Sequence, residues 1–174
     1  MKILKNLSSR EILKIYLEEN NRIKGPDYKQ IKRVIRKKKS GYLVNLTKKE
    51  IEEIIMVNHF LCNCNYYFNF KGMVLRKFAG LNLKQVFLKI VKDEKYPKKY
   101  LVCWERINKQ KNLLEQKKRS TIFLSQGRPF FFDLSYFGAD KQESKLFLVD
   151  GFHRLVALMF LKNKSNILKF VLIK

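Results

Sequence analysis

The segment with the clearest chemical content lies near the end of the chain, where Val149-Asp150-Gly151-Phe152-His153-Arg154 is followed by an apolar run. An apolar strand that turns sharply into a helix leaves the N–H groups of the first helical turn without intrahelical partners, and these groups attract an anion. His153 adds a titratable donor to that turn, and Arg154 adds a permanent forked cation. We expect Asp150 to cap the helix and Gly151 to allow the tight turn. The sequence therefore predicts a phosphate-binding pocket here.

This segment resembles the signature of the ParB/sulfiredoxin-like superfamily, whose members carry a strand, then Asp-Gly-x-His-Arg or a variant, then a helix rich in Leu and Ala. The upstream segment 122–129, followed by an aromatic strand, is similar to the family's helix, its Gly-x-Pro turn and its first hairpin strand. Asn163 and the hydrophobic strand after it are similar to the closing element. The resemblance covers about residues 100–174 and implies a small α+β domain with a mixed sheet.

The family includes DNA-partition proteins that bind a cytidine nucleotide, nucleases, a free-serine kinase and sulfiredoxin. Phe152 stands where sulfiredoxin needs Cys, and the Gly-Glu-Arg-Arg motif of partition proteins is absent, so the nuclease and kinase branches match better. The resemblance implies that Asp150 orients the turn or a metal. The phosphate-binding residues that it implies are Gly151, Phe152, His153 and Arg154.

A nuclease or phosphotransferase also needs a carboxylate as base or metal ligand. Glu105, Glu115 and Asp133 are candidates, and spacing does not decide among them. No metal-ligand set is assigned, and Mg2+ and a nucleotide are the candidate cofactors. A structural interpretation stays open, because Asp-Gly is an ordinary cap and an Arg in a first turn can simply pair with a nearby carboxylate. The residues taken as catalytic candidates are Asp150, His153, Arg154 and Glu105.

The chain of 174 residues carries 38 Lys and Arg against 15 Asp and Glu, for a formal net charge of +23. Residues 1–126 hold 30 of the basic and 11 of the acidic residues. Such an excess repels itself unless a polyanion neutralises it, so nucleic acid, DNA or RNA, is the expected partner. An anionic membrane surface is the rival, and a basic protein without a polyanion is the third interpretation.

A basic helix is predicted over residues 27–39, with Ile31, Val34 and Ile35 on its apolar side and Ser40-Gly41 as its stop. The helix would lie along phosphates, while an aromatic neighbour such as Tyr42 stacks on bases. The alternative is an ordinary solvated helix face. The expected nucleic-acid contacts are Lys29, Lys32, Arg33, Arg36, Lys37, Lys38 and Lys39.

We expect an α+β fold in which a basic, mainly helical region over residues 1–99 precedes a ParB/sulfiredoxin-like domain over residues 100–174. Capping boxes predict helix starts at Ser8 and Thr47, and Asn82 is a further cap. After residue 100 the pattern predicts a strand, a basic helix, a hairpin, a helix and a final strand. The first strand spans residues 100–107, and the basic helix continues to about residue 124. The two hairpin strands span 129–137 and 145–149, the next helix spans 152–163, and the final strand spans 167–173.

Three cysteines, Cys62, Cys64 and Cys103, show no disulfide-framework spacing, so we expect a reducing compartment: cytoplasm, nucleoid or organelle. With His59 they could supply four zinc ligands, but Cys-x-Cys is not the usual knuckle, and buried thiols are the simpler interpretation. No apolar stretch approaches the ~18–20 residues of a membrane span, and the N-terminus lacks a secretory signal. The sequence leaves the oligomeric state undetermined.

These observations predict a nucleic-acid-associated protein with a ParB-like phosphate site, acting as a nuclease or phosphotransfer enzyme. One alternative is a non-catalytic structural component of a ribonucleoprotein, such as an organellar ribosome. A second alternative is a small-molecule, serine-type kinase, against which the basic N-terminal region counts.

Overall fold

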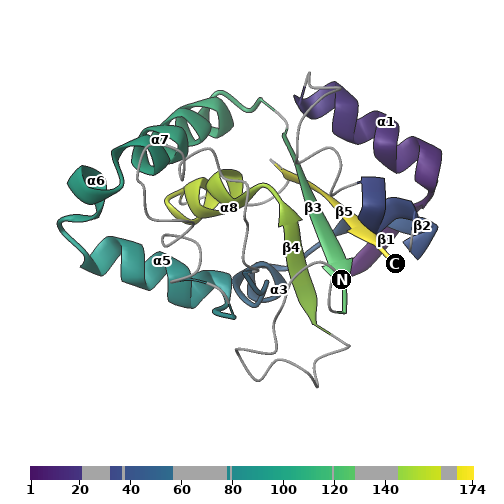
Figure 1. Cartoon of the computed structure of the whole chain (residues 1–174), viewed down its shortest axis with the longest axis horizontal. Helices are drawn as coiled ribbons and strands as arrows, with labels where there is room; N and C mark the ends of the chain where they lie inside the picture. Colours follow the sequence, from purple (N-terminus) through teal and green to yellow (C-terminus); the bar gives the residue numbers. More distant parts are fainter. Residues whose placement is uncertain are drawn as a thin grey trace.

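A mixed five-stranded sheet lies between two layers of helices in the computed structural model of the protein (Figure 1). The fold is thus α+β, as the sequence predicted. The strands run in the order β1-β2-β5-β3-β4. They are β1 (Lys2–Ser8), β2 (Ser40–Asn45), β3 (Ser120–Gln126), β4 (Leu146–Asp150) and β5 (Leu168–Ile173). The structure describes residues 1–20, 32–36, 38–56, 78, 80–118, 120–127, 145–161 and 168–174.

Neighbouring strands pair antiparallel, except for β3 and β5, which run parallel. β2 pairs with β5 from Gly41 opposite Ile173 to Val44 opposite Phe170. A side chain at Gly41 would meet Leu172 O at 2.4 Å, so this glycine permits the close approach of the two strands. β1 and β2 belong to residues 1–99, and the other three strands follow residue 99. One sheet therefore includes strands from both predicted regions, residues 1–99 and residues 100–174.

The two faces of the sheet carry separate hydrophobic cores, because side chains alternate along each strand. On β3, Phe123 packs on the face covered by α1 (Ser9–Asn20) and by the helical residues 32–36 and 38; we call this the α1 face. Ile122 and Leu124 pack on the opposite face, which we call the α8 face. The helices on the α8 side are α3 (Lys48–Glu52), α5 (Leu83–Lys92), α6 (Tyr96–Lys99), α7 (Leu101–Glu115) and α8 (Phe152–Met159).

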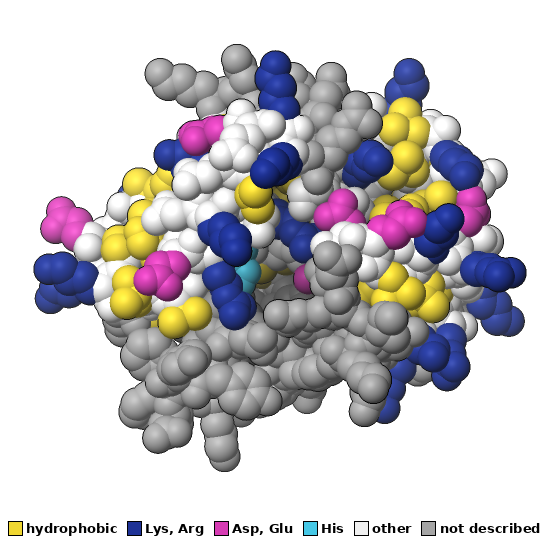
Figure 2. Space-filling view, turned by 90° about the horizontal axis from the view of Figure 1, so that it is seen from above, with side chains coloured by type: hydrophobic (Ala, Val, Ile, Leu, Met, Phe, Trp, Pro, Cys, Tyr) yellow, Lys and Arg dark blue, Asp and Glu magenta, His cyan; other side chains and the backbone are white. Residues whose placement is uncertain are grey.

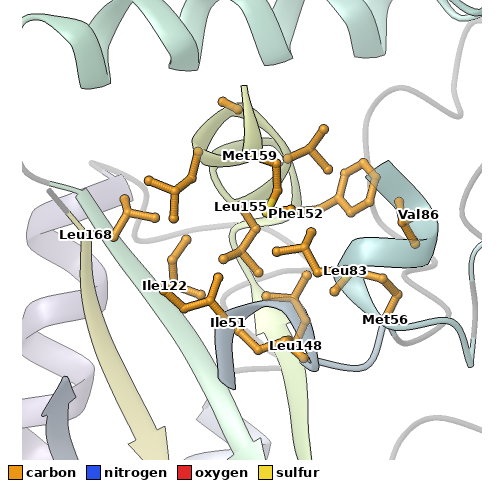
Figure 3. Close-up of a cluster of buried hydrophobic side chains, with 14 of the residues drawn as sticks. Ile51, Met56, Leu83, Val86, Ile122, Leu148, Phe152, Leu155, Met159 and Leu168 are labelled. Carbon is orange, nitrogen blue, oxygen red and sulfur yellow. The ribbon is translucent and has the colours of Figure 1, made fainter. Parts of the chain in front are cut away.

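Helix α8 is the centre of the larger core (Figure 3). Leu155 is fully buried, and so are Ile122 and Leu83, which reach the same cluster from β3 and α5. Six of the eight residues of α8 are buried. Full burial of one such aliphatic side chain stabilises a fold by roughly 1.5–3 kcal/mol, so the position of α8 on the sheet is strongly fixed.

The predicted helix starts are confirmed. The Thr47 side chain accepts a hydrogen bond from the Glu50 amide while Glu50 accepts from the Thr47 amide, and Asn82 forms the same reciprocal pair with Gln85. Ser8 begins α1 in the same way. The helix after Thr47 ends at Glu52, and the chain then runs beside β4.

The predicted strand at 100–107 is wrong, because α7 occupies this region. The β-branched and aromatic residues of this segment favour a strand. That preference is outweighed by the burial of Cys103, Ile107 and Leu114, which recur at helical spacing. The predicted extension of that helix to about residue 124 is also wrong. Lys117 ends it in a left-handed conformation with φ 54°, although glycine is the usual residue there, and the chain then enters β3.

The other predicted elements after residue 120 have mixed outcomes. The strand near 145–149, the helix beginning at Phe152 and the final strand correspond to β4, α8 and β5. α8 ends at Met159, before the predicted limit of residue 163. The described partner of β4 is β3, and the predicted strand over 129–137 lies outside the described residues.

Glu11 joins β1 to the start of α1 by hydrogen bonds that depend on pH. Its carboxylate accepts from Lys5 Nζ at 2.7 Å and from the Ser8 amide and hydroxyl at 2.8 and 2.9 Å. These bonds, with Lys5 foremost, lower the pKa of Glu11 from 4.5 to about 2. Because the folded-state pKa lies below the unfolded one, the stabilisation is complete above about pH 4.5 and is lost as the pH falls through about 2.

We predict that Glu11→Gln lowers the urea midpoint of unfolding at neutral pH and that the difference from the unsubstituted protein shrinks as the pH approaches 2. Circular dichroism across a pH series measures this. Glu18→Gln is the matched control, since Glu18 lies exposed on the same helix and only approaches Lys14 at 3.9 Å. An equal loss at both ends of the pH range for Glu11→Gln would contradict the assignment.

Candidate functional site

Gly151 makes the turn from β4 into α8. It has φ 107° and ψ 25°, it is buried, and a Cβ placed on it would lie 2.5 Å from Ile122 Cδ1. Gly151 is also the residue that precedes the first turn, and its carbonyl accepts from the Leu155 amide at 2.9 Å. The expectation that Asp150 caps α8 is wrong. Asp150 is still in the sheet, opposite Phe123, and α8 has no side-chain cap.

Arg154 anchors the start of α8 to the neighbouring strand. Helical side chains lean toward the helix N-terminus, so Arg154 reaches back over the turn. Its Nη1 donates to the Thr121 carbonyl of β3 at 2.7 Å and lies 3.8 Å from Asp150 Oδ2. Arg154 and Asp150 side chains are 15% and 27% exposed. The structure therefore brings Arg154 and Asp150 together as an ion pair. Such a pairing of an arginine in the first helical turn with a nearby carboxylate was the structural alternative to a phosphate site.

One carboxylate oxygen in this pair is not hydrogen bonded. Asp150 Oδ2 is buried and has no hydrogen-bond partner among the described residues. A buried polar atom without a partner is uncommon in folded proteins, and such atoms mark strain, a bound water or ion, or a functional role. The oxygen lies 3.8 Å from the guanidinium of Arg154, at the edge of the apolar core.

β3 also contacts α1 on the other face of the sheet, through residues that the sequence analysis did not identify. Thr121 Oγ1 donates to Glu19 Oε1 at 2.7 Å, and Ser120 Oγ lies 3.5 Å from Glu19 Oε2. Glu19 thus holds the end of α1 to β3, one residue from Ile122. A cavity of about 340 Å³ lies here, and Lys169 and Leu43 are among the residues that line it. No sequence motif predicts the contact between Glu19 and Thr121, because the two residues lie about a hundred positions apart.

His153 points to α7. Its Nε2 lies 3.4 Å from Cys103 Sγ, which in turn lies 3.4 Å from the hydroxyl of Tyr96. Cys103 is buried, as the sequence predicted for a thiol. Phe152 is buried too, and its ring stacks on Phe78 with centroids 6.2 Å apart. Only the backbone of Phe152 is therefore suited to the phosphate contact that the resemblance implied.

Figure 2 shows several Lys and Arg side chains gathered around a hollow on one face of the molecule. Such a gathering of cations suits an anionic ligand.

The upstream carboxylates do not join this cluster. Glu105 is exposed on α7, two positions from Cys103, which corresponds to about 200° around the helix and places it on the side away from His153. Glu115 is also exposed and lies 3.8 Å from Lys111. Asp133 lies outside the described residues. Within the described part of the chain, no group of three or more His, Cys, Asp or Glu side chains is placed to hold a metal ion.

The basic helix presents its charges outward. Val34 and Ile35 are buried on the α1 face, whereas Arg33, Arg36 and Lys39 are exposed. Lys32 is half-buried, and Lys38 donates to the Gln126 carbonyl at 3.2 Å. Lys29 and Lys37 lie outside the described residues. The helix ends at Lys39, with φ 62°, and Ser40-Gly41, the predicted stop, belongs to β2.

Tyr42 does not extend the surface of the basic helix. It packs on the α8 face, the side of the sheet opposite to Val34 and Ile35, and Lys174 Nζ lies 5.8 Å from the centre of its ring. Because neighbouring residues of a strand point to opposite faces, a tyrosine three residues after the helix need not lie beside it. Stacking of bases on Tyr42 next to the basic helix is therefore not supported.

Comparison of the chain with protein-family models, curated proteins and solved structures found no match. The resemblance to the ParB/sulfiredoxin-like superfamily thus stays a prediction from the motif and its order of elements. Among the helices that the structure describes, none has the length and apolar character needed to cross a membrane.

We predict that Gly151→Ala lowers the free energy of unfolding by about 1–3 kcal/mol, because alanine is strained at this φ and its Cβ meets Ile122 Cδ1. A double-mutant cycle with Ile122→Val, measured by chemical denaturation, separates the two causes. Valine lacks Cδ1, so Gly151→Ala should cost less in that background. The same cost in both backgrounds would contradict the close contact.

Proposed function

We propose that the protein binds nucleic acid through its positively charged exterior. The observation that carries the proposal is the net charge of +23 together with its placement. Residues 32–39 hold six basic and no acidic residues, and the helix in this region buries Val34 and Ile35 while Arg33, Arg36 and Lys39 stay exposed. Phosphates along a nucleic-acid strand would neutralise these side chains, and the release of condensed counterions would favour binding.

The proposed contacts are made to phosphate groups, which hold a protein on the nucleic acid without reading its bases. The buried side of the helix fixes how the arginines are presented, because Val34 and Ile35 belong to the α1-face core. Lys38, bonded to the carbonyl of Gln126, holds the helix to the end of β3. We therefore propose binding with little dependence on base sequence.

We predict that the affinity for a short duplex, measured by fluorescence anisotropy, falls with salt with a log–log slope of about −0.9 per phosphate neutralised on DNA. Arg33→Ala with Arg36→Ala should reduce the slope by about 2. Lys14→Ala with Lys48→Ala is the matched control, since these exposed lysines lie outside residues 32–39. Binding that does not change with salt, or no binding to either DNA or RNA, would overturn the proposal.

A second candidate function is phosphate chemistry at the turn between β4 and α8, as a nuclease or phosphotransfer enzyme. The buried oxygen of Asp150 without a hydrogen bond favours it, because it lies beside Arg154 in the same turn as His153. Mg2+ fits these residues poorly, since a guanidinium lies 3.8 Å from that oxygen and the described residues offer no further metal-ligand group beside it. In this candidate the backbone and Arg154 bind the phosphate, and His153 moves a proton.

We predict for this candidate that the protein converts labelled RNA, labelled DNA or a labelled nucleoside triphosphate, and that His153→Gln removes the activity. Lys145→Gln is a control for the loss of one exposed charge outside the turn. An unsubstituted protein that leaves all three substrates intact would eliminate the catalytic candidate and leave the binding proposal standing. Co-purification in a stoichiometric particle with RNA would then support the structural role in a ribonucleoprotein.

A further inference from the structure

A second basic surface lies on the opposite side of the sheet from the basic helix. Residues 83–118, which form α5, α6 and α7, hold eleven basic and four acidic residues. We call their exposed lysines the α5–α7 basic face. These lysines are Lys84, Lys89, Lys92, Lys95, Lys98 and Lys109, with Lys117 and Lys118 just after the end of α7.

The packing of the helices fixes the direction of these lysines. α5 buries Leu83, Val86 and Ile90, which recur at helical spacing, so Lys84, Lys89 and Lys92 fall on its remaining surface. Among the described side chains, Lys84, Lys89, Lys92 and Lys98 form no ion pair with a carboxylate. On the sequence this face is easily missed, because its lysines alternate with apolar residues instead of forming a run.

Three exposed apolar side chains lie on these helices, two on α5 and Leu101 at the start of α7. Leu88 is 45% exposed and Val91 is 53% exposed, and the helical positions of Lys84 and Lys92 flank them. Lysines around a small apolar area can contact phosphates and sugars of one backbone together. An anionic lipid surface would offer similar chemistry. Three separate apolar side chains provide little area for insertion into lipid, and so we favour nucleic acid.

The two basic surfaces point away from each other. Figure 1 shows α5, α6 and α7 on one side of the sheet and α1 on the other, and the basic helix packs with α1. Lys and Arg side chains accordingly lie toward both ends of the view in Figure 2. A duplex has a persistence length of about 50 nm, far longer than a domain of this size, so one straight duplex cannot contact both surfaces.

We propose that the protein bridges two segments of nucleic acid, one on residues 32–39 and the other on the α5–α7 basic face. This inference rests on the proposed binding of nucleic acid and adds a second site to it. The ligand of that site is a phosphodiester backbone. Separate arms of the experiment with duplex DNA and duplex RNA identify which backbone it is.

The test mixes two short duplexes, one carrying a fluorescence donor and the other an acceptor, with the full chain. We expect energy transfer that rises with protein and falls again when excess protein covers each duplex separately. The substitutions Lys84→Gln, Lys89→Gln and Lys92→Gln together should abolish energy transfer, while the affinity for one duplex falls less than about tenfold because the basic helix is intact. Light scattering of the protein with one bound duplex tests whether a monomer does the bridging, and a dimer with one duplex on each copy would overturn the inference.

The matched control replaces three exposed lysines outside both surfaces, Lys2→Gln, Lys14→Gln and Lys48→Gln, and should keep the energy transfer. Unchanged energy transfer in the α5 triple variant overturns the inference, as does binding of a single duplex without any transfer. Vesicles of anionic lipid that bind the unsubstituted protein but not the α5 variant, while that variant still bridges duplexes, also overturn it. If neither duplex shifts the anisotropy at all, the proposed function itself has failed.

Discussion

The packing of α8 on β3 is the contact on which the rest of the structure depends. β3 bonds to β4 on one edge and to β5 on the other, and α8 covers it with Leu155 against Ile122. A Cβ at residue 151 would lie 2.5 Å from Ile122 Cδ1 and would be strained at φ 107°, so this packing favours glycine in the turn. It also brings Arg154 within reach of the Thr121 carbonyl. The apolar packing of the helix and the polar arrangement of the candidate site are therefore one constraint.

The sequence predicted those parts of the fold that depend on local chemistry. Helix starts were predictable because Thr47 and Asn82 each bond to a residue three positions away. The sharp turn at Gly151 was predictable because glycine tolerates a positive φ, although its neighbour Asp150 is not the cap. β1 was missed, since exposed residues dominate it and only Leu7 is buried. A strand of this kind is defined by its hydrogen-bond partner, and its own sequence carries little sign of it.

The candidate site was predicted in composition and only partly in arrangement. The motif placed Asp150, His153 and Arg154 in one turn, but their partners Thr121 and Cys103 come from β3 and α7, which are remote in sequence. Glu105 was predicted to join the site, but its segment forms a helix where a strand was predicted. In this helix Glu105 lies on the side away from His153. The net charge could be read from the composition. The placement of basic residues on both sides of the sheet could not, because it depends on which helices pack on each face.

That order of strands also affects how the molecule is made. β5 lies between β2 and β3, yet it follows all four other strands along the chain. Until it is synthesised, β1 with β2 and β3 with β4 are two separate ribbons that share no hydrogen bonds, and each exposes an apolar surface. The lysine-rich segments would keep the nascent chain in solution by mutual repulsion during this interval. Closure of the sheet is then a late, long-range step, which contact-order arguments associate with slow folding and a need for chaperones.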